Sequence, residues 1–94
     1  MSGCRISISY CTQCQWLLRA AWMAQELLST FGADLGEVAL VPGTGGIFEI
    51  RCDDELLWER KRDGGFPDVT TLKQLVRDRI DPERDLGHLD RNRS

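Results

Sequence analysis

The sequence has few of the features that mark membrane, secreted and nucleic-acid-binding proteins. No apolar run approaches the ~20 residues needed to cross a bilayer, and residues 1–5 lead directly into a strand-like segment without a secretory apolar region. The formal net charge of −3 argues against general binding to phosphate backbones. The only tight basic run, residues 60–62, is interpreted as a solvated strand end. We therefore expect a cytoplasmic protein with no nucleic-acid or membrane partner.

Motifs of non-thiol catalysis are also missing. The glycine-rich segment 43–46 lacks the lysine of a phosphate-binding loop, and no serine–histidine–acid arrangement is evident. The single histidine, His88, lies in a polar tail, where we expect a surface residue. In a reducing cytosol structural disulfides are rare. The four cysteines are therefore expected to be catalytic, metal-binding or simply buried.

The length of 94 residues predicts one domain with one modest core. Alternating apolar residues predict strands, and apolar residues three and four apart predict helices. The expected elements are a strand at 5–10, a helix from just after Cys14 to Phe31, a strand at 37–41, two strands at 47–52 and 55–61, and a helix at 69–80 with Asp68 as its N-cap. The first helix is expected to bury a stripe of Leu17, Ala20, Ala21, Ala24, Leu27, Leu28 and Phe31.

The order β-α-β-β-β-α predicts a thioredoxin-like α/β fold with a mixed four-stranded sheet. Its first two strands should be parallel and its last two an antiparallel hairpin with a turn at 53–54. The two helices are expected either on one face of the sheet or on opposite faces. Residues 81–94 are expected to form a polar, partly mobile tail of this single domain.

The strongest chemical signal is the pair Cys11 and Cys14, which stands between a predicted strand and a predicted helix. Cysteines three residues apart on one turn lie within the Cα separation that a disulfide tolerates, about 4.4–6.8 Å. The free N–H groups and positive end of a following helix stabilise thiolate, the form that attacks disulfides. This context predicts a redox-active dithiol.

Other interpretations of the cysteines are weaker. A structural zinc site usually needs four ligands, and the chain has no second CxxC, only Cys4, Cys52 and His88 as further candidates. We therefore expect no metal. Cys4 opens the first strand and Cys52 closes the third, so both should lie at the end of the sheet opposite the CxxC. Two buried free thiols are expected there, and a second, regulatory disulfide is the alternative.

The chain resembles the selenoprotein W/T/H-type redox family, also called Rdx, in its cysteine-containing bacterial form. The resemblance spans nearly the whole length and rests on an ordered series of segments: Ile8-Ser9-Tyr10-Cys11-x-x-Cys14-x-Trp16, Glu26–Phe31, Gly46–Glu49, Gly65-Phe66-Pro67, Leu72-Lys73-Gln74 with Val76-Arg77-Asp78, and Leu86-Gly87-His88. It implies a thioredoxin-like fold and an oxidoreductase activity. In selenocysteine-bearing relatives the motif is CxxU, with selenocysteine matching Cys14. The resemblance thus favours Cys14 as the attacking residue, whereas thioredoxin logic favours Cys11.

The expected surroundings of the dithiol come from three segments: the CxxC itself, the segment after the second strand, and the loop 64–67, which leads back toward the same end. Thr12 and Gln13 lie between the cysteines, and Trp16 either covers the thiols or packs in the core. Ligands usually bind at the carboxyl ends of parallel strands, so the segment following the second strand should lie nearby. The candidates for a substrate groove are Thr12, Gln13, Trp16, Gly45, Gly46, Phe48, Phe66 and Pro67.

The sequence thus predicts a thiol–disulfide oxidoreductase or redox sensor. Its expected partner is a protein disulfide or glutathione disulfide, with no bound cofactor and with glutathione as a candidate co-substrate. The alternative is an interaction module whose contact with a protein is gated by the redox state of Cys11 and Cys14.

Overall fold

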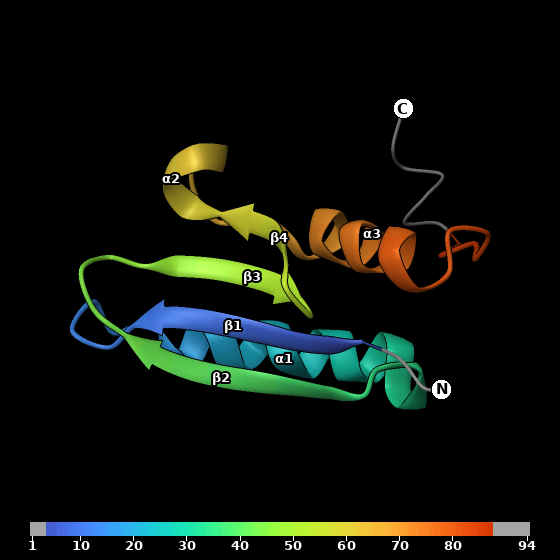
Figure 1. Cartoon of the computed structure of the whole chain (residues 1–94), viewed down its shortest axis with the longest axis horizontal. Helices are drawn as coiled ribbons and strands as arrows, with labels where there is room; N and C mark the ends of the chain where they lie inside the picture. The colour runs from blue at the N-terminus through green and yellow to red at the C-terminus, as the bar shows by residue number, and fades with distance from the viewer. Residues whose placement is uncertain (1–3, 88–94) are drawn as a thin grey trace.

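The fold was analysed in a computed structural model that describes residues 4–87. The elements are β1 (Arg5–Cys11), α1 (Leu17–Phe31), the 3-10 turn η1 (Gly32–Asp34), β2 (Glu37–Gly43), β3 (Phe48–Cys52), β4 (Glu55–Glu59), α2 (Arg60–Asp63) and α3 (Val69–Ile80) (Figure 1). Among these described residues no helix combines the length and the apolar character needed to cross a membrane.

The four strands form one mixed sheet in the order β2-β1-β3-β4. β1 runs parallel to β2, with Ile8 opposite Leu40, and antiparallel to β3, with Ile8 opposite Ile50. β3 and β4 form an antiparallel hairpin. The predicted thioredoxin-like arrangement, including the parallel first pair and the closing hairpin, is confirmed.

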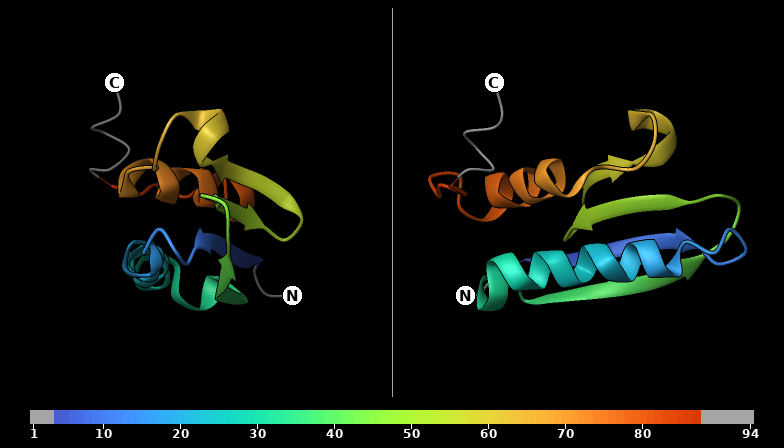
Figure 2. Two further views of the ribbon diagram at one scale, coloured as in Figure 1. Left: turned by 90° about the vertical axis from the view of Figure 1, so that its left-hand side faces the viewer. Right: turned by 180° about the vertical axis from the view of Figure 1, so that it is seen from behind.

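Both long helices cover the same face of the sheet, which resolves the two arrangements that the sequence allowed. Figure 2 shows α1 and α3 together on one side of the strands. Lys73 of α3 donates a hydrogen bond to Glu26 of α1 at 2.9 Å, which joins the two helices directly. Alternate side chains of β1 and β3 point toward the helices and form the core with buried residues of α1 and α3. The strands contribute Ile6, Ile8, Phe48 and Ile50, and the helices contribute Met23, Leu27, Leu72 and Val76.

The buried stripe of α1 is rotated around the helix relative to the predicted one. Leu17 and Leu28 remain 47% and 45% exposed, and Met23, which the predicted stripe omitted, is fully buried. The residues of α1 that are buried recur at three- and four-residue steps and so share one face of the helix: Ala20, Met23, Ala24, Leu27 and Phe31. At about 100° per residue Leu17 and Leu28 lie on one flank of that face and Met23 on the other, so the buried face is rotated toward Met23.

The basic run at residues 60–62 belongs to a short helix, so its prediction as a strand end is wrong. β4 stops at Glu59, whose carboxylate accepts hydrogen bonds from the backbone N–H groups of Arg62 at 2.7 Å and Lys61 at 3.2 Å. These hydrogen bonds, led by that from Arg62, lower the pKa of Glu59. Gly64 ends the turn in the left-handed conformation, with φ 80°. The Glu59 N-cap and the Gly64 C-cap together explain why a helix forms here although the sequence has no apolar pattern that predicts one.

Asp68 caps α3 as predicted, and its removal should destabilise the fold. Its carboxylate accepts a hydrogen bond from Thr71 N at 2.7 Å. Asp68→Ala leaves that N–H without its partner, so we expect the free energy of unfolding to fall by about 1 kcal/mol. Denaturant unfolding measures the loss, and Asp68→Ser is the matched control because serine also caps. An equal loss in both variants would show that the cap is not the cause.

The first part of the predicted tail is attached to the domain. Arg84 pairs with Asp34, and its guanidinium lies 5.6 Å from the centre of the Phe31 ring. Arg77 donates a hydrogen bond to the carbonyl of Arg84 at 2.8 Å, and Leu86 packs against the core. These contacts hold residues 81–87, whereas His88 and the rest of the predicted mobile tail lie outside the described residues.

Candidate functional site

Cys11 and Cys14 form a disulfide at the carboxyl end of β1. Their Cα atoms are 5.3 Å apart, within the usual range for this bond. Cys11 is the last residue of β1 and is only 2% exposed, whereas Cys14 lies in the following turn and is exposed. The site therefore presents one cysteine to solvent and keeps the other below it.

The turn between β1 and α1 is closed by its own backbone. Gln15 N donates to Thr12 O at 3.1 Å, and Trp16 N donates to Cys11 O at 3.4 Å. Gln15 adopts a left-handed conformation, with φ 63°, and Trp16 is the N-cap of α1. Cys14 therefore lies before the cap and not in the first helical turn. Because the helix dipole acts mainly within the first turn, its effect on Cys14 is smaller than the sequence predicted.

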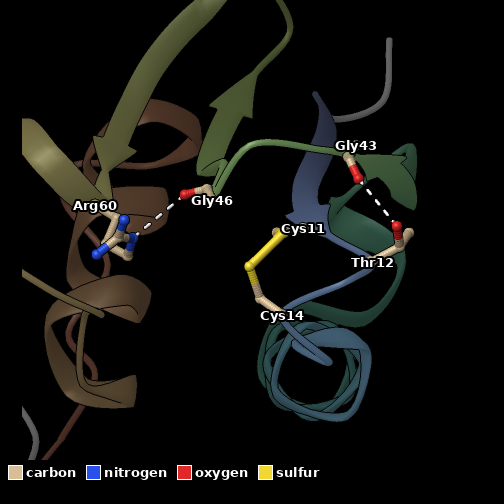
Figure 3. Close-up of a disulfide and its surroundings, with 6 residues drawn as sticks. All are labelled: Cys11, Thr12, Cys14, Gly43, Gly46 and Arg60. Atoms are coloured by element: carbon tan, nitrogen blue, oxygen red, sulfur yellow. Dashed lines mark hydrogen bonds between the residues drawn. A yellow bond between two sulfur atoms is a disulfide. The ribbon is translucent and has the colours of Figure 1, made fainter.

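The β2–β3 segment passes over the end of β1, because β1 lies between β2 and β3 in the sheet. Thr12 donates two hydrogen bonds to Gly43 O, from its backbone N at 3.1 Å and from its hydroxyl at 3.2 Å, the latter drawn in Figure 3. Gly45 and Gly46 turn the chain with φ values of 71° and 77°, a conformation that favours glycine. The segment is thus a crossing connection fixed against the disulfide turn, and not a hairpin.

Three aromatic rings pack together beside the disulfide turn. Phe66 lies between the other two, with ring centres 5.0 Å from Trp16 and 4.9 Å from Phe48. All these contacts are edge-to-face, including the 6.2 Å contact of Trp16 with Phe48. Of the two roles considered for Trp16, these contacts support packing. Trp58 Nε1 donates to Gly65 O at 2.8 Å and so holds the segment that carries Phe66.

Two arginines that sequence reasoning missed flank the aromatic rings. The Arg19 guanidinium carbon lies 4.1 Å from the centre of the Phe66 ring, and that of Arg60 lies 5.0 Å from Trp16. Arg60 Nε also donates to Gly46 O at 3.4 Å, so it connects α2 with the crossing segment (Figure 3). Both arginines thus place positive charge on the aromatic rings that pack beside the disulfide turn. No local motif announces them, because they meet the rings only in the folded chain.

The predicted groove residues divide by exposure. Thr12, Gln13 and Gly45 are exposed around the disulfide turn. Trp16, Gly46 and Phe66 are half-buried. Phe48 and Pro67 are buried and support the site from within. The structure therefore brings three predicted segments to one end of the sheet, and among the predicted groove residues Thr12, Gln13 and Gly45 are the most exposed.

The other two cysteines lie at the opposite end of β1 and are free thiols. Cys52 is buried and Cys4 is half-buried. Burial, followed by the hydrogen bond with Cys4, raises the pKa of Cys52 to about 12. The thiol of Cys52 is therefore protonated at neutral pH, unlike a working nucleophile.

Comparison with known proteins identifies relatives over most of the chain. The model of the Rdx family matches residues 5–78. A crystal structure of a Bordetella parapertussis protein is 74% identical, with 81% of this chain and 96% of that chain covered and a TM-score of 0.80. A selenoprotein W-related protein from Vibrio cholerae is 55% identical, with 85% of this chain and 100% of that chain covered and a TM-score of 0.83. A search of curated proteins gave no match.

The matched region contains the whole sheet, α1 and most of α3, together with the Cys11–Cys14 pair, whose geometry is compatible with redox chemistry. A family model that matches most of the chain and two similar structures of the same fold agree with each other. The chain belongs to the Rdx family.

Proposed function

We propose that this protein is a thiol–disulfide oxidoreductase or redox sensor that exchanges its Cys11–Cys14 pair with a protein disulfide or glutathione disulfide in the cytoplasm. The observation that carries the proposal is the disulfide itself, built in a backbone-closed turn with Cys14 exposed and Cys11 buried beside it. An exposed sulfur meets the substrate, and a protected neighbour resolves the mixed disulfide before solvent thiols do.

The proposed reaction begins with the reduced pair. The Cys14 thiolate attacks one sulfur of the substrate disulfide, forms a mixed disulfide and expels the other substrate sulfur as a thiolate. Cys11, after losing its proton, attacks the Cys14 sulfur and expels the second substrate thiolate. Two electrons pass to the substrate, whose two sulfurs take up the two protons. A thiol reductant such as glutathione restores the pair by the reverse exchange.

Neighbouring positive charge supports the formation of a thiolate at this turn. The guanidinium groups of Arg19 and Arg60 lie over the aromatic rings next to the turn and favour anionic species there. Such groups stabilise a thiolate and attract a carboxylate-bearing substrate such as glutathione disulfide. No separate cofactor is required by this scheme, since the electrons are held by the two sulfurs.

A redox-gated interaction module is the second candidate, and a specific surface favours it. The first two turns of α1, next to the disulfide turn, expose Leu18 at 82% and also Leu17 and Trp22. Neighbouring exposed apolar side chains mark contact sites for proteins. In this case the redox state of Cys11 and Cys14 would change the contact with a protein partner, and no substrate disulfide would be turned over.

The reduction potential and the turnover of a model disulfide together test the proposal. We expect a potential of roughly −200 to −270 mV, in the thioredoxin-to-glutaredoxin range, and repeated turnover with a thiol reductant. The double variant Cys11→Ser/Cys14→Ser should lose turnover entirely. The matched control, Cys4→Ser/Cys52→Ser, removes two thiols elsewhere and should retain it. A stable disulfide without turnover in the wild type would favour the interaction module instead.

A further inference from the structure

Three side chains of metal-ligating types lie together at the end of the sheet away from the disulfide. Cys4 precedes β1, Cys52 ends β3, and Asp53 follows in the β3–β4 turn. The antiparallel register places Ile6 opposite Cys52, so Cys4, two residues earlier, is on the same face as Cys52. The two Sγ atoms and a carboxylate oxygen of Asp53 all lie within 4.8 Å of one another.

The backbone fixes these three donors relative to one another. Asp53 N donates to Arg5 O at 2.8 Å, and Arg5 N donates back to Asp53 Oδ1 at 3.0 Å. Arg5 follows Cys4 in the chain, and Asp53 follows Cys52. The two hydrogen bonds between Arg5 and Asp53 therefore keep the backbones of both cysteines close together. Asp53 takes up the left-handed conformation, with φ 55°, which aspartate tolerates better than most residues. A hydrogen bond to a ligating carboxylate is the kind of support that orients metal ligands.

The spacing and chemistry of the donors suit a thiophilic cation. Zinc bonds of about 2.3 Å to sulfur and 2.0–2.2 Å to oxygen, at tetrahedral angles, separate the donors by roughly 3.3–3.8 Å. Side-chain rotations that close the present spacing by about 1 Å therefore suffice. Two cysteines exclude a preference for Mg²⁺ or Ca²⁺, which take oxygen ligands. Asp53 is exposed, so a water molecule has access to the fourth position.

We propose that Cys4, Cys52 and Asp53 form a binding site for a thiophilic divalent cation such as Zn²⁺. Binding displaces the two thiol protons to solvent. The two thiolates and the carboxylate then neutralise the charge of the divalent cation and leave one net negative charge at the site. Such a cation joins the start of β1 to the end of β3. Because it binds the folded chain, it would stabilise the fold by an amount that rises with the logarithm of the free cation concentration once that exceeds Kd. The site is independent of the proposed redox function, because it shares no residue with the Cys11–Cys14 turn.

Cobalt titration tests the site directly. The protein used is the Cys11→Ser/Cys14→Ser variant, reduced with a phosphine, so that the other pair cannot bind the probe. We expect one Co²⁺ per chain, a thiolate-to-cobalt charge-transfer band in the near ultraviolet, and displacement of that band by Zn²⁺. Adding Cys4→Ser removes one of the three donors and should weaken binding by about 100-fold or more, at least as much as the loss of an outer-shell partner costs, so that no band forms at the same Co²⁺ concentration. Cys4 is chosen because it is half-buried, so its replacement disturbs the fold less than that of Cys52.

The aspartates of the β3–β4 turn provide a matched pair. Asp53→Asn keeps an oxygen for Arg5 N and the left-handed conformation but removes the charge, so we expect about 10-fold weaker binding. Asp54→Asn makes the same change one residue away and should leave binding unaltered.

Circular dichroism checks that every variant is folded. Absence of the band, or a band that survives Cys4→Ser, would overturn the proposal.

Discussion

Cys14→Ser should abolish attack on a disulfide substrate, whereas Cys11→Ser should attack once and then remain attached to its substrate. The reason is the difference in exposure, since Cys14 faces solvent and Cys11 is 2% exposed. We expect Cys14→Ser to lower the rate of the first exchange step by about a thousandfold or more, as when a covalent nucleophile is removed. Cys11→Ser retains that step and loses only resolution, so the mixed disulfide accumulates.

Mass spectrometry of trapped adducts measures both outcomes. Each variant is incubated with a peptide disulfide, free thiols are blocked, and the adduct is located by fragmentation. The test is cleanest in a Cys4→Ser/Cys52→Ser background, where the only remaining thiol is the one under study. A persistent adduct on Cys11 in the Cys14→Ser protein would contradict the assignment and give Cys11 the attacking role.

The elements with strong local patterns could be predicted from the sequence. The alternation of Ile6, Ile8 and Tyr10 predicted β1, and Asp68 before an apolar period predicted the start of α3. Two features could not be predicted this way. The helix α2 has no apolar period and depends on the Glu59 cap, and the choice of one face for both helices depends on packing between them.

The candidate site likewise has some features that could be predicted from the sequence and others that could not. The pair Cys11 and Cys14 has a sequence signature, and the strand order brings the 43–46 segment to it once β1 is placed between its neighbours. The turn that separates Cys14 from α1 could not be predicted from the sequence, because it depends on the left-handed conformation of Gln15. Arg60 is part of a basic run that is ordinary on surfaces, and only the folded chain places it over Trp16.

The aromatic contacts beside the site should make Phe48 important for stability and not for substrate binding. Phe48 is 0% exposed, lies opposite Tyr10 in the sheet and contacts the rings of both Trp16 and Phe66. Phe48→Ala opens a cavity that its rigid neighbours cannot fill, so we expect the free energy of unfolding to fall by about 3–5 kcal/mol. Denaturant unfolding of the oxidised protein, followed by circular dichroism, measures this loss.

Phe66→Ala is the matched control, because Phe66 belongs to the same group of rings but is half-buried. Its loss removes less buried surface, so we expect a smaller decrease, about 1–2 kcal/mol. Phe48→Leu should retain most of the stability, since it keeps an apolar side chain of similar volume in the core. If Phe48→Ala left stability unchanged but slowed disulfide exchange, the ring would be contacting substrate, and its burial would be specific to the resting form of the site.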